Sequence, residues 1–175
     1  IPVSAGLLYQ QYGNPDALHP QATSAPSQAD IETMVAGLAA RLESEPDNIE
    51  GWNMLGKSYM MMRRYADARS VFKQLLDKSP DETNLLLSYA DASAMNAGGV
   101  FSGEPYKVIQ RILELDPTHI QARWMAGMAE QQSGNQEQAL AIWQPLLLDL
   151  QQVSPEMSAE LQKMITSISD APEQN

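Results

Sequence analysis

The stretch that decides the fold covers residues 49–80 and reads IEGWNMLGKSYMMMRRYADARSVFKQLLDKSP. Its apolar residues recur three or four positions apart, which is the spacing of one face of an α-helix. Two small residues, Gly56 and Ala68, stand among bulky ones, where two packed helices would approach each other most closely. The stretch therefore predicts two helices that pack on each other and end before Pro80.

The same residues match the tetratricopeptide (TPR) repeat, a helix–turn–helix unit of about 34 residues. The pattern asks for seven residues at fixed positions, and this chain has all seven: Trp52, Leu55, Gly56, Tyr59, Ala68, Phe72 and Pro80. The boundary prolines Pro46, Pro80 and Pro117 are 34 and then 37 residues apart. We therefore expect an all-α TPR solenoid of about three repeats.

The second and third repeats keep less of the pattern. The third retains Gly127, Ala139 and a bulky Trp143 at the matching positions. The second is degenerate, and the turn between its helices is stretched by three residues over residues 98–103. A final apolar stripe over residues 155–169 predicts a helix that caps the open end of the solenoid.

Composition along the chain predicts three segments. Residues 1–28 contain a Pro/Ser/Ala-rich stretch without periodicity, and we expect them to form an N-terminal tether. Residues 29–170 are expected to form the TPR domain, opening with an N-terminal helix, and residues 171–175 a disordered tail. No stretch approaches the roughly 18 apolar residues that span a bilayer. Because the chain begins with Ile1 and not with Met, we expect its N-terminus to be a truncation or cleavage point, at which an upstream signal or anchor could have been removed.

Charge and cysteine content exclude several classes of function. Eleven basic and 22 acidic residues give a net charge of −11, and the isoelectric point is near 4.4. Nucleic acid is therefore not an expected partner, because phosphate binding needs clustered Lys and Arg. Basic proteins are expected partners, because a negative chain attracts them. The chain has no cysteine, which excludes thiol catalysis, disulfides and covalent haem attachment within it.

Catalytic, metal and cofactor sites are not predicted. The two histidines, His19 and His119, have no second ligand at a suitable spacing, and we expect His119 to be an exposed residue of a first helical turn. The pair Gly98 and Gly99 is not followed by the Lys and Ser or Thr of a phosphate-binding loop. We therefore expect a binding protein and not an enzyme.

The predicted binding surface is the groove lined by the first helix of each repeat. The repeat register assigns ten residues to this groove: Asn53, Lys57, Met60, Met61, Leu87, Asp91, Met95, Trp124, Met128 and Gln132. The candidate site itself consists of seven of them: Asn53, Lys57, Met60, Leu87, Asp91, Trp124 and Met128. Asp91 and Met128 stand where other TPR proteins carry polar clamps for a C-terminal carboxylate, so an apolar helix is the expected ligand.

Trp124 has two possible placements in this register. It falls one position after the usual core residue, where it faces the groove, and there it would join Leu87 and Met128 in an apolar floor. Lys57 and Asp91 would then orient the ligand. Alternatively, a slipped register places the Trp124 ring in the core.

Several strings, in order along nearly the whole chain, resemble the periplasmic half of the CcmI family, also called CycH. They are LY and YGNPD within residues 8–16, IETMV at 31–35, GWNMLGKSY at 51–59, YADA at 89–92, LDPTH at 115–119 and WMAG at 124–127. The related factors of nitrite reductase haem attachment share this architecture and remain an alternative, as does a TPR scaffold for envelope protein assembly.

The resemblance implies a membrane-anchored protein whose TPR domain lies in the periplasm. It implies a chaperone that holds the C-terminal helix of apocytochrome c and presents it to the haem lyase complex for covalent haem attachment. The absence of cysteine agrees with this, because the domain does not compete for the thiols of its substrate.

Overall fold

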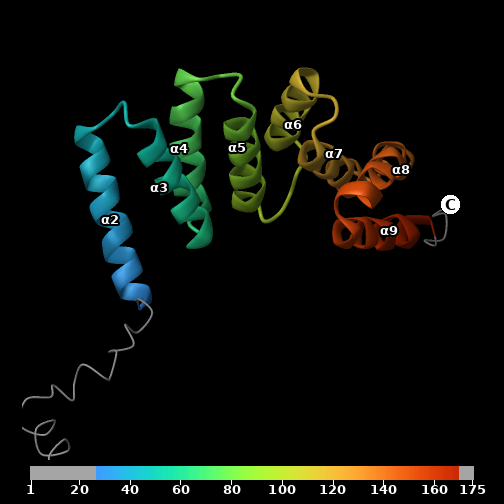
Figure 1. Cartoon of the computed structure of the whole chain (residues 1–175), viewed down its shortest axis with the longest axis horizontal. Helices are drawn as coiled ribbons and strands as arrows, with labels where there is room; N and C mark the ends of the chain where they lie inside the picture. Colours follow the sequence, from blue (N-terminus) through green and yellow to red (C-terminus); the bar gives the residue numbers. More distant parts are fainter. Residues whose placement is uncertain (1–26, 170–175) are drawn as a thin grey trace, which may run out of the picture. The chain divides into compact units, whose positions relative to one another are not determined.

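The computed structural model describes residues 27–169, and nearly all of them are helical (Figure 1). The helices are α2 (Gln28–Ser44), α3 (Ile49–Met61), α4 (Tyr65–Lys78), α5 (Thr83–Asn96), α6 (Glu104–Leu115), α7 (Ile120–Gln132), α8 (Gln136–Val153) and α9 (Pro155–Ser169). The described part contains no strand, and the predicted all-α class is confirmed. Apart from residues 27 and 28, the predicted tether and the predicted tail lie outside the described residues.

The chain divides into two units, residues 1–37 and 38–175. In the first unit the structure describes residues 27–37, which include the start of α2. Ser27 caps this helix in a reciprocal arrangement. Its backbone N–H donates to the Asp30 carboxylate at 2.9 Å, and the Asp30 N–H donates to the Ser27 hydroxyl at 3.3 Å. Helices α3 to α9 all belong to the second unit.

The second unit is a series of stacked helical pairs. Its strongest inter-helix contacts join consecutive helices, from the pair α3 and α4 through to α8 and α9, which is the contact pattern of a solenoid. Helices α3 and α4 form the first repeat, α5 and α6 the second, and α7 and α8 the third, with α9 as the final helix. The predicted TPR architecture is thereby confirmed.

Glycine lets an aromatic ring lie directly on the first helix of two repeats. A Cβ atom added at Gly56 would lie 2.7 Å from two ring carbons of Phe72. At Gly127 an added Cβ would overlap the indole of Trp143, which is completely buried. The small and large residues of the pattern therefore pack as the sequence predicts, in the third repeat as well as in the first.

The first helix of each repeat begins with a capping side chain. In each case the cap accepts a hydrogen bond from the backbone N–H three residues ahead: Asn48 from Gly51 at 2.9 Å, Glu82 from Leu85 at 2.7 Å, and His119 from Ala122 at 3.2 Å. Such caps satisfy N–H groups that have no partner within the helix. His119 is therefore half-buried at the start of α7, and not the exposed first-turn residue that the sequence predicts.

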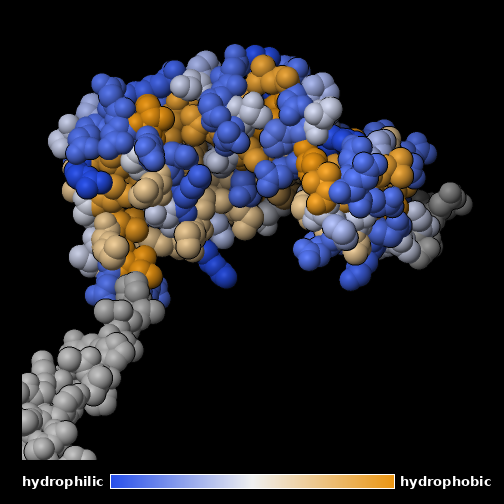
Figure 2. Space-filling view, viewed as in Figure 1, coloured by the Kyte–Doolittle hydropathy of each residue, from blue (hydrophilic) through white to orange (hydrophobic). Residues whose placement is uncertain are grey.

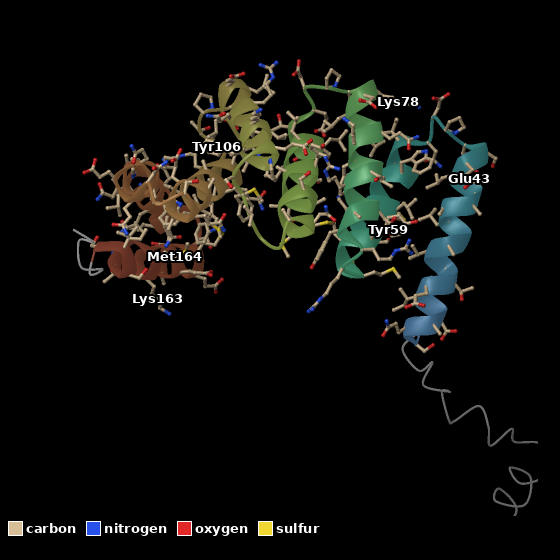
Figure 3. All side chains as sticks on the ribbon, turned by 180° about the vertical axis from the view of Figure 1, so that it is seen from behind. Glu43, Tyr59, Lys78, Tyr106, Lys163 and Met164 are labelled. Atoms are coloured by element: carbon tan, nitrogen blue, oxygen red, sulfur yellow. The ribbon has the colours of Figure 1, made fainter. Side chains whose placement is uncertain are left out.

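Ion pairs recur at the repeat boundaries. Lys78, at the end of α4 in Figure 3, donates to the Asp47 carboxylate at 2.8 Å. One repeat later, Arg111 pairs with Asp81 at the same distance of 2.8 Å. Each aspartate directly follows a boundary proline. At each of these boundaries the proline therefore follows the end of one helix, and the aspartate after it forms an ion pair with a later helix.

The long turn of the second repeat is held by a side chain of α7. Gly98, Gly99 and Gly103 all have positive φ, a conformation that glycine adopts without strain. The Gln132 side chain accepts from the Phe101 N–H at 2.8 Å and donates to the Gly99 carbonyl at 2.8 Å. Gln132, which the register assigns to the groove, therefore fixes this turn.

A polar network ties the start of α6 to α4 and α5. The Arg69 guanidinium donates to Glu104 at 2.6 Å, and the Tyr89 hydroxyl donates to the other oxygen of the same carboxylate at 2.5 Å. Arg69 also donates to the Ser93 hydroxyl at 3.2 Å. The hydrogen bond from Tyr89, followed by that from Arg69, lowers the pKa of Glu104 below its ordinary value of 4.5.

Candidate functional site

A pocket of about 270 Å³ opens between the first two repeats. Six residues of α3, α4 and α5 line it: Lys57, Met60, Met61, Phe72, Ser88 and Asp91. We call it the Asp91 pocket. Three of these residues, Lys57, Met60 and Asp91, belong to the candidate site predicted from the sequence, so the structure brings this part of the prediction together.

Helical spacing explains why these side chains converge. Lys57, Met60 and Met61 are three and four residues apart on α3, and therefore share one face. Ser88 and Asp91 are three apart on α5 and share a face in the same way. That spacing is the signal by which Ser88 could have been found. Phe72 could not, because its pattern position identifies it as a core residue and it is only 1% exposed.

The two charged residues of the pocket have no partner within the described part of the chain. Asp91 is half-buried and makes no hydrogen bond or ion pair there, and Lys57 is exposed and also unpaired. Burial raises the pKa of the Asp91 carboxyl above its ordinary value. A half-buried carboxylate without a partner costs free energy in the folded state. A contribution to the stability of the fold therefore does not explain why an aspartate stands at position 91. The pocket thus combines an apolar wall with one carboxylate, which is half-buried, and one ammonium group, which is exposed, and both are unpaired within residues 27–169.

The other four candidate residues do not line the pocket. Three of them pack against one or both of two clusters of buried residues. The middle cluster consists of Leu86, Ala90, Ala94, Phe101, Ile109, Ile112, Ala122, Ala126 and Ala129. The C-terminal cluster consists of Ala139, Trp143, Leu146, Leu150, Leu161, Ile165 and Ile168. Leu87 packs on the middle cluster, Trp124 on the C-terminal cluster, and Met128 on both.

Trp124 lies between the two placements considered from the sequence. It is half-buried, and its ring packs on the C-terminal cluster without being enclosed by it. Its backbone carbonyl accepts a hydrogen bond from the Trp143 indole N–H at 3.1 Å. Asn53, on the first repeat, is half-buried, and its Oδ1 atom is buried without a partner in the described structure.

Neither a metal site nor a membrane span is found among residues 27–169. In that range no three His, Cys, Asp or Glu side chains are grouped so that they could hold a metal ion. None of the helices α2 to α9 is both long and apolar enough to cross a bilayer. Figure 2 shows apolar residues in small areas between hydrophilic ones on the face in view.

The stacked helical pairs of α3 to α8 define a TPR-repeat protein. Residues 15–157 match the family described as the cytochrome c-type biogenesis protein H TPR domain. The chain belongs to this family. The prediction made from the ordered strings of the sequence is thereby confirmed.

Two relatives have names that bear on function. The cytochrome c-type biogenesis protein CycH of Pseudomonas aeruginosa is 26% identical over 159 residues, which cover 91% of this chain and 39% of that protein. The formate-dependent nitrite reductase complex subunit NrfG of Escherichia coli O157:H7 is 24% identical over 121 residues, 69% of this chain and 61% of NrfG. This chain therefore spans about two fifths of the length of the CycH relative.

Solved structures agree on the fold. A crystal structure of MamA protein superposes with a TM-score of 0.63 and 16% sequence identity, over 81% of this chain and 78% of MamA. At this identity the likeness concerns the arrangement of helices alone.

Proposed function

We propose that this chain is a peptide-binding adaptor of cytochrome c maturation. It holds the C-terminal helix of apocytochrome c and delivers the chain for covalent haem attachment. The observation that carries the proposal is membership of the cytochrome c-type biogenesis protein H TPR family over residues 15–157. The proposed site is the groove of the first helices, with its seven candidate residues and no catalytic group.

Three properties of the chain support this proposal. The Asp91 pocket is open and has an apolar wall, as a site for side chains of an amphipathic helix requires. A net charge of −11 favours encounter with a basic polypeptide. The chain has no cysteine that could form a mixed disulfide with the haem-binding thiols of its substrate.

The proposal extends to location and partners. The domain works in the periplasm as part of an inner-membrane protein, and components of the haem lyase complex are its further partners. Support comes from the name of the P. aeruginosa relative, a cytochrome c-type biogenesis protein.

The proposal is tested by calorimetry with the haem-free and haem-bound forms of one c-type cytochrome. A folded holocytochrome hides its C-terminal helix in its own core, so the apo form should bind at least about tenfold more tightly. Equal affinity for the two forms contradicts the chaperone function. Binding to the holo form alone would instead favour a scaffold that joins folded proteins.

The match to NrfG supports a second candidate, a factor for haem attachment to nitrite reductase. The same titration separates the two candidates when a peptide from the C-terminal segment of the nitrite reductase is used in place of apocytochrome c. Preference for that peptide identifies the second candidate.

A further inference from the structure

The Asp91 pocket combines an apolar wall with an acidic group that lacks a partner. Met60 and Met61 from α3 and the ring of Phe72 from α4 supply the apolar surface. Asp91 enters from α5, is half-buried, and has neither a hydrogen bond nor an ion pair within the described residues. Lys57 also lines the pocket, but its side chain is exposed to solvent, whereas Asp91 is half-buried beside the apolar wall. A ligand that satisfies the apolar wall and the half-buried carboxylate must carry an apolar group and a positive charge close together.

The size of the pocket points to side chains as its occupants. Its volume of about 270 Å³ lies just below the range of about 300–1,000 Å³ that is typical of small-molecule sites. It suits one large apolar side chain with the stem of a second one. Side chains one helical turn apart reach such adjacent positions, because residues separated by three or four positions share a helix face.

The surface around the pocket remains uncovered on α3. Met61 is 87% exposed, and Met54, seven residues earlier on the same face, is 57% exposed. Methionine side chains are flexible and adapt to varied apolar partners. Together with Met61, Met54 adds exposed apolar surface on α3 next to the pocket.

We propose that the Asp91 pocket is the anchor of the groove, and that its ligand is a basic amphipathic helix. One large apolar side chain of that helix packs among Met60, Met61 and Phe72. A lysine or arginine one turn away pairs with the Asp91 carboxylate. The net charge of −11 and the half-buried Asp91 favour a basic helix over an acidic one, and among the described lining residues the exposed Lys57 is the one group of opposite sign. The inference rests on the proposed function and specifies what the apocytochrome helix must present.

The test uses calorimetry on the full chain. The probe is a synthetic peptide of the C-terminal helix of a c-type apocytochrome, beside a second peptide whose Lys and Arg residues are replaced by Glu. The variants are Asp91→Asn, which keeps the shape of the side chain, and Asp91→Lys, which reverses its charge. Asp77→Asn is the matched control, because Asp77 is exposed on α4 and does not line the pocket.

We expect Asp91→Asn to weaken binding of the basic peptide by about tenfold, and Asp91→Lys to weaken it further. Asp77→Asn should leave the affinity unchanged, although it removes the same charge. The Glu-substituted peptide should bind the wild type poorly and recover affinity with Asp91→Lys. Ser88→Leu, which fills the pocket without a change of charge, should also reduce binding of the basic peptide.

The possible failures are distinguishable. If the wild type binds the basic peptide and Asp91→Asn binds it equally well, the anchor is overturned and the proposed function stands. If the wild type binds neither the peptide nor the intact apocytochrome, the proposed function is overturned, and the anchor with it. Circular dichroism of each variant confirms that it is folded before it is titrated.

Discussion

The first two repeats differ from the third in the surface that they place at one position of the repeat. Lys57, Asp91 and Met128 occupy the ninth position of α3, α5 and α7, counted from the first residue of each helix. The first two line an open pocket and have no partner in the described structure, whereas Met128 packs on both the middle and the C-terminal clusters. The register of a repeat fixes which way a side chain points, but its neighbours decide whether it can bind anything.

The neighbours differ for a physical reason. In the third repeat the indole of Trp143 lies on Gly127 and reaches the backbone of α7, and α9 adds further apolar residues to the same cluster. In the first repeat the smaller ring of Phe72 lies on Gly56, and Phe72 also lines the pocket. The C-terminal end thus uses its apolar surface for packing, while the α3–α5 region leaves some of it open.

The largest effect on stability is expected from Trp143→Ala. Trp143 is 0% exposed and donates a hydrogen bond to the Trp124 carbonyl. Its truncation removes a fully buried aromatic side chain and should lower the free energy of unfolding by about 3–5 kcal/mol. Urea denaturation followed by circular dichroism measures the loss.

Trp124→Ala is the matched control, because Trp124 is half-buried beside the same cluster. Its loss of stability should be clearly smaller, roughly 1–2 kcal/mol. Equal losses for the two variants would mean that Trp124 is as much a core residue as Trp143, and the groove would then end before the third repeat.

A moderate effect is expected from Ala68→Leu in the first repeat. Ala68 is 0% exposed where α4 packs on its neighbours, so the added atoms must displace packed ones. We expect a loss of about 1–3 kcal/mol. Ala66→Leu, at an exposed position of the same helix, should change stability by less than about 0.5 kcal/mol. An unchanged melting temperature for Ala68→Leu would refute the repeat register.

A smaller, pH-dependent effect is expected from Glu104→Gln. The pKa of Glu104 is lowered in the folded state, so its contribution is complete above its unfolded value near 4.5 and is lost as the pH falls below it. The glutamine variant should lose about 1 kcal/mol at neutral pH, a modest value because the side chain is half exposed. Its stability should also fall less steeply in acid.

Glu137→Gln provides the comparison for this pH profile. Glu137 is an exposed residue in the first turn of α8, as Glu104 is in the first turn of α6. Both substitutions remove one acidic charge near a helix N-terminus. If Glu137→Gln reduces the loss of stability at acid pH as much as Glu104→Gln does, the network with Tyr89 and Arg69 contributes nothing specific.

The smallest expected effect on stability is a gain, and it comes from Asp91→Asn. Burial raises the pKa of Asp91, so its ionised form opposes folding, and the stability gained by protonation is lost as the pH rises through that pKa. Asp91→Asn should therefore raise the free energy of unfolding at pH 7, by less than about 1 kcal/mol. Chemical denaturation at pH 7 measures this gain. A loss of stability would indicate that Asp91 has a structural partner.

The fold follows from the sequence because its pattern lies in the packing residues. The spacing of Gly56 and Phe72 predicts a contact between two helices, and the same spacing recurs at Gly127 and Trp143. The stretched turn before Gly103 is also visible, because three glycines fall between two apolar helices. Such signals are local, and they repeat along the chain.

The candidate site is predicted only in part, for a related reason. Helical register identifies Lys57, Met60 and Asp91 as groove residues, and the structure gathers them at one pocket. The helical register does not reveal that Trp124 packs on residues of α8 and α9, since those contacts depend on side-chain volumes across three helices. The role of Gln132 in holding the long turn is hidden for the same reason, because its partners are 31 and 33 residues away.

The most direct test of the account is methyl NMR of the ten methionines with and without the apocytochrome peptide. Met60 and Met61 line the Asp91 pocket, whereas Met157 and Met164 pack on the C-terminal cluster. We predict that the peptide shifts the Met60 and Met61 signals strongly and leaves those of Met157 and Met164 in place. Shifts at Met157 and Met164 with Met60 and Met61 unchanged would contradict the account, because the ligand would then bind at the other end of the repeats.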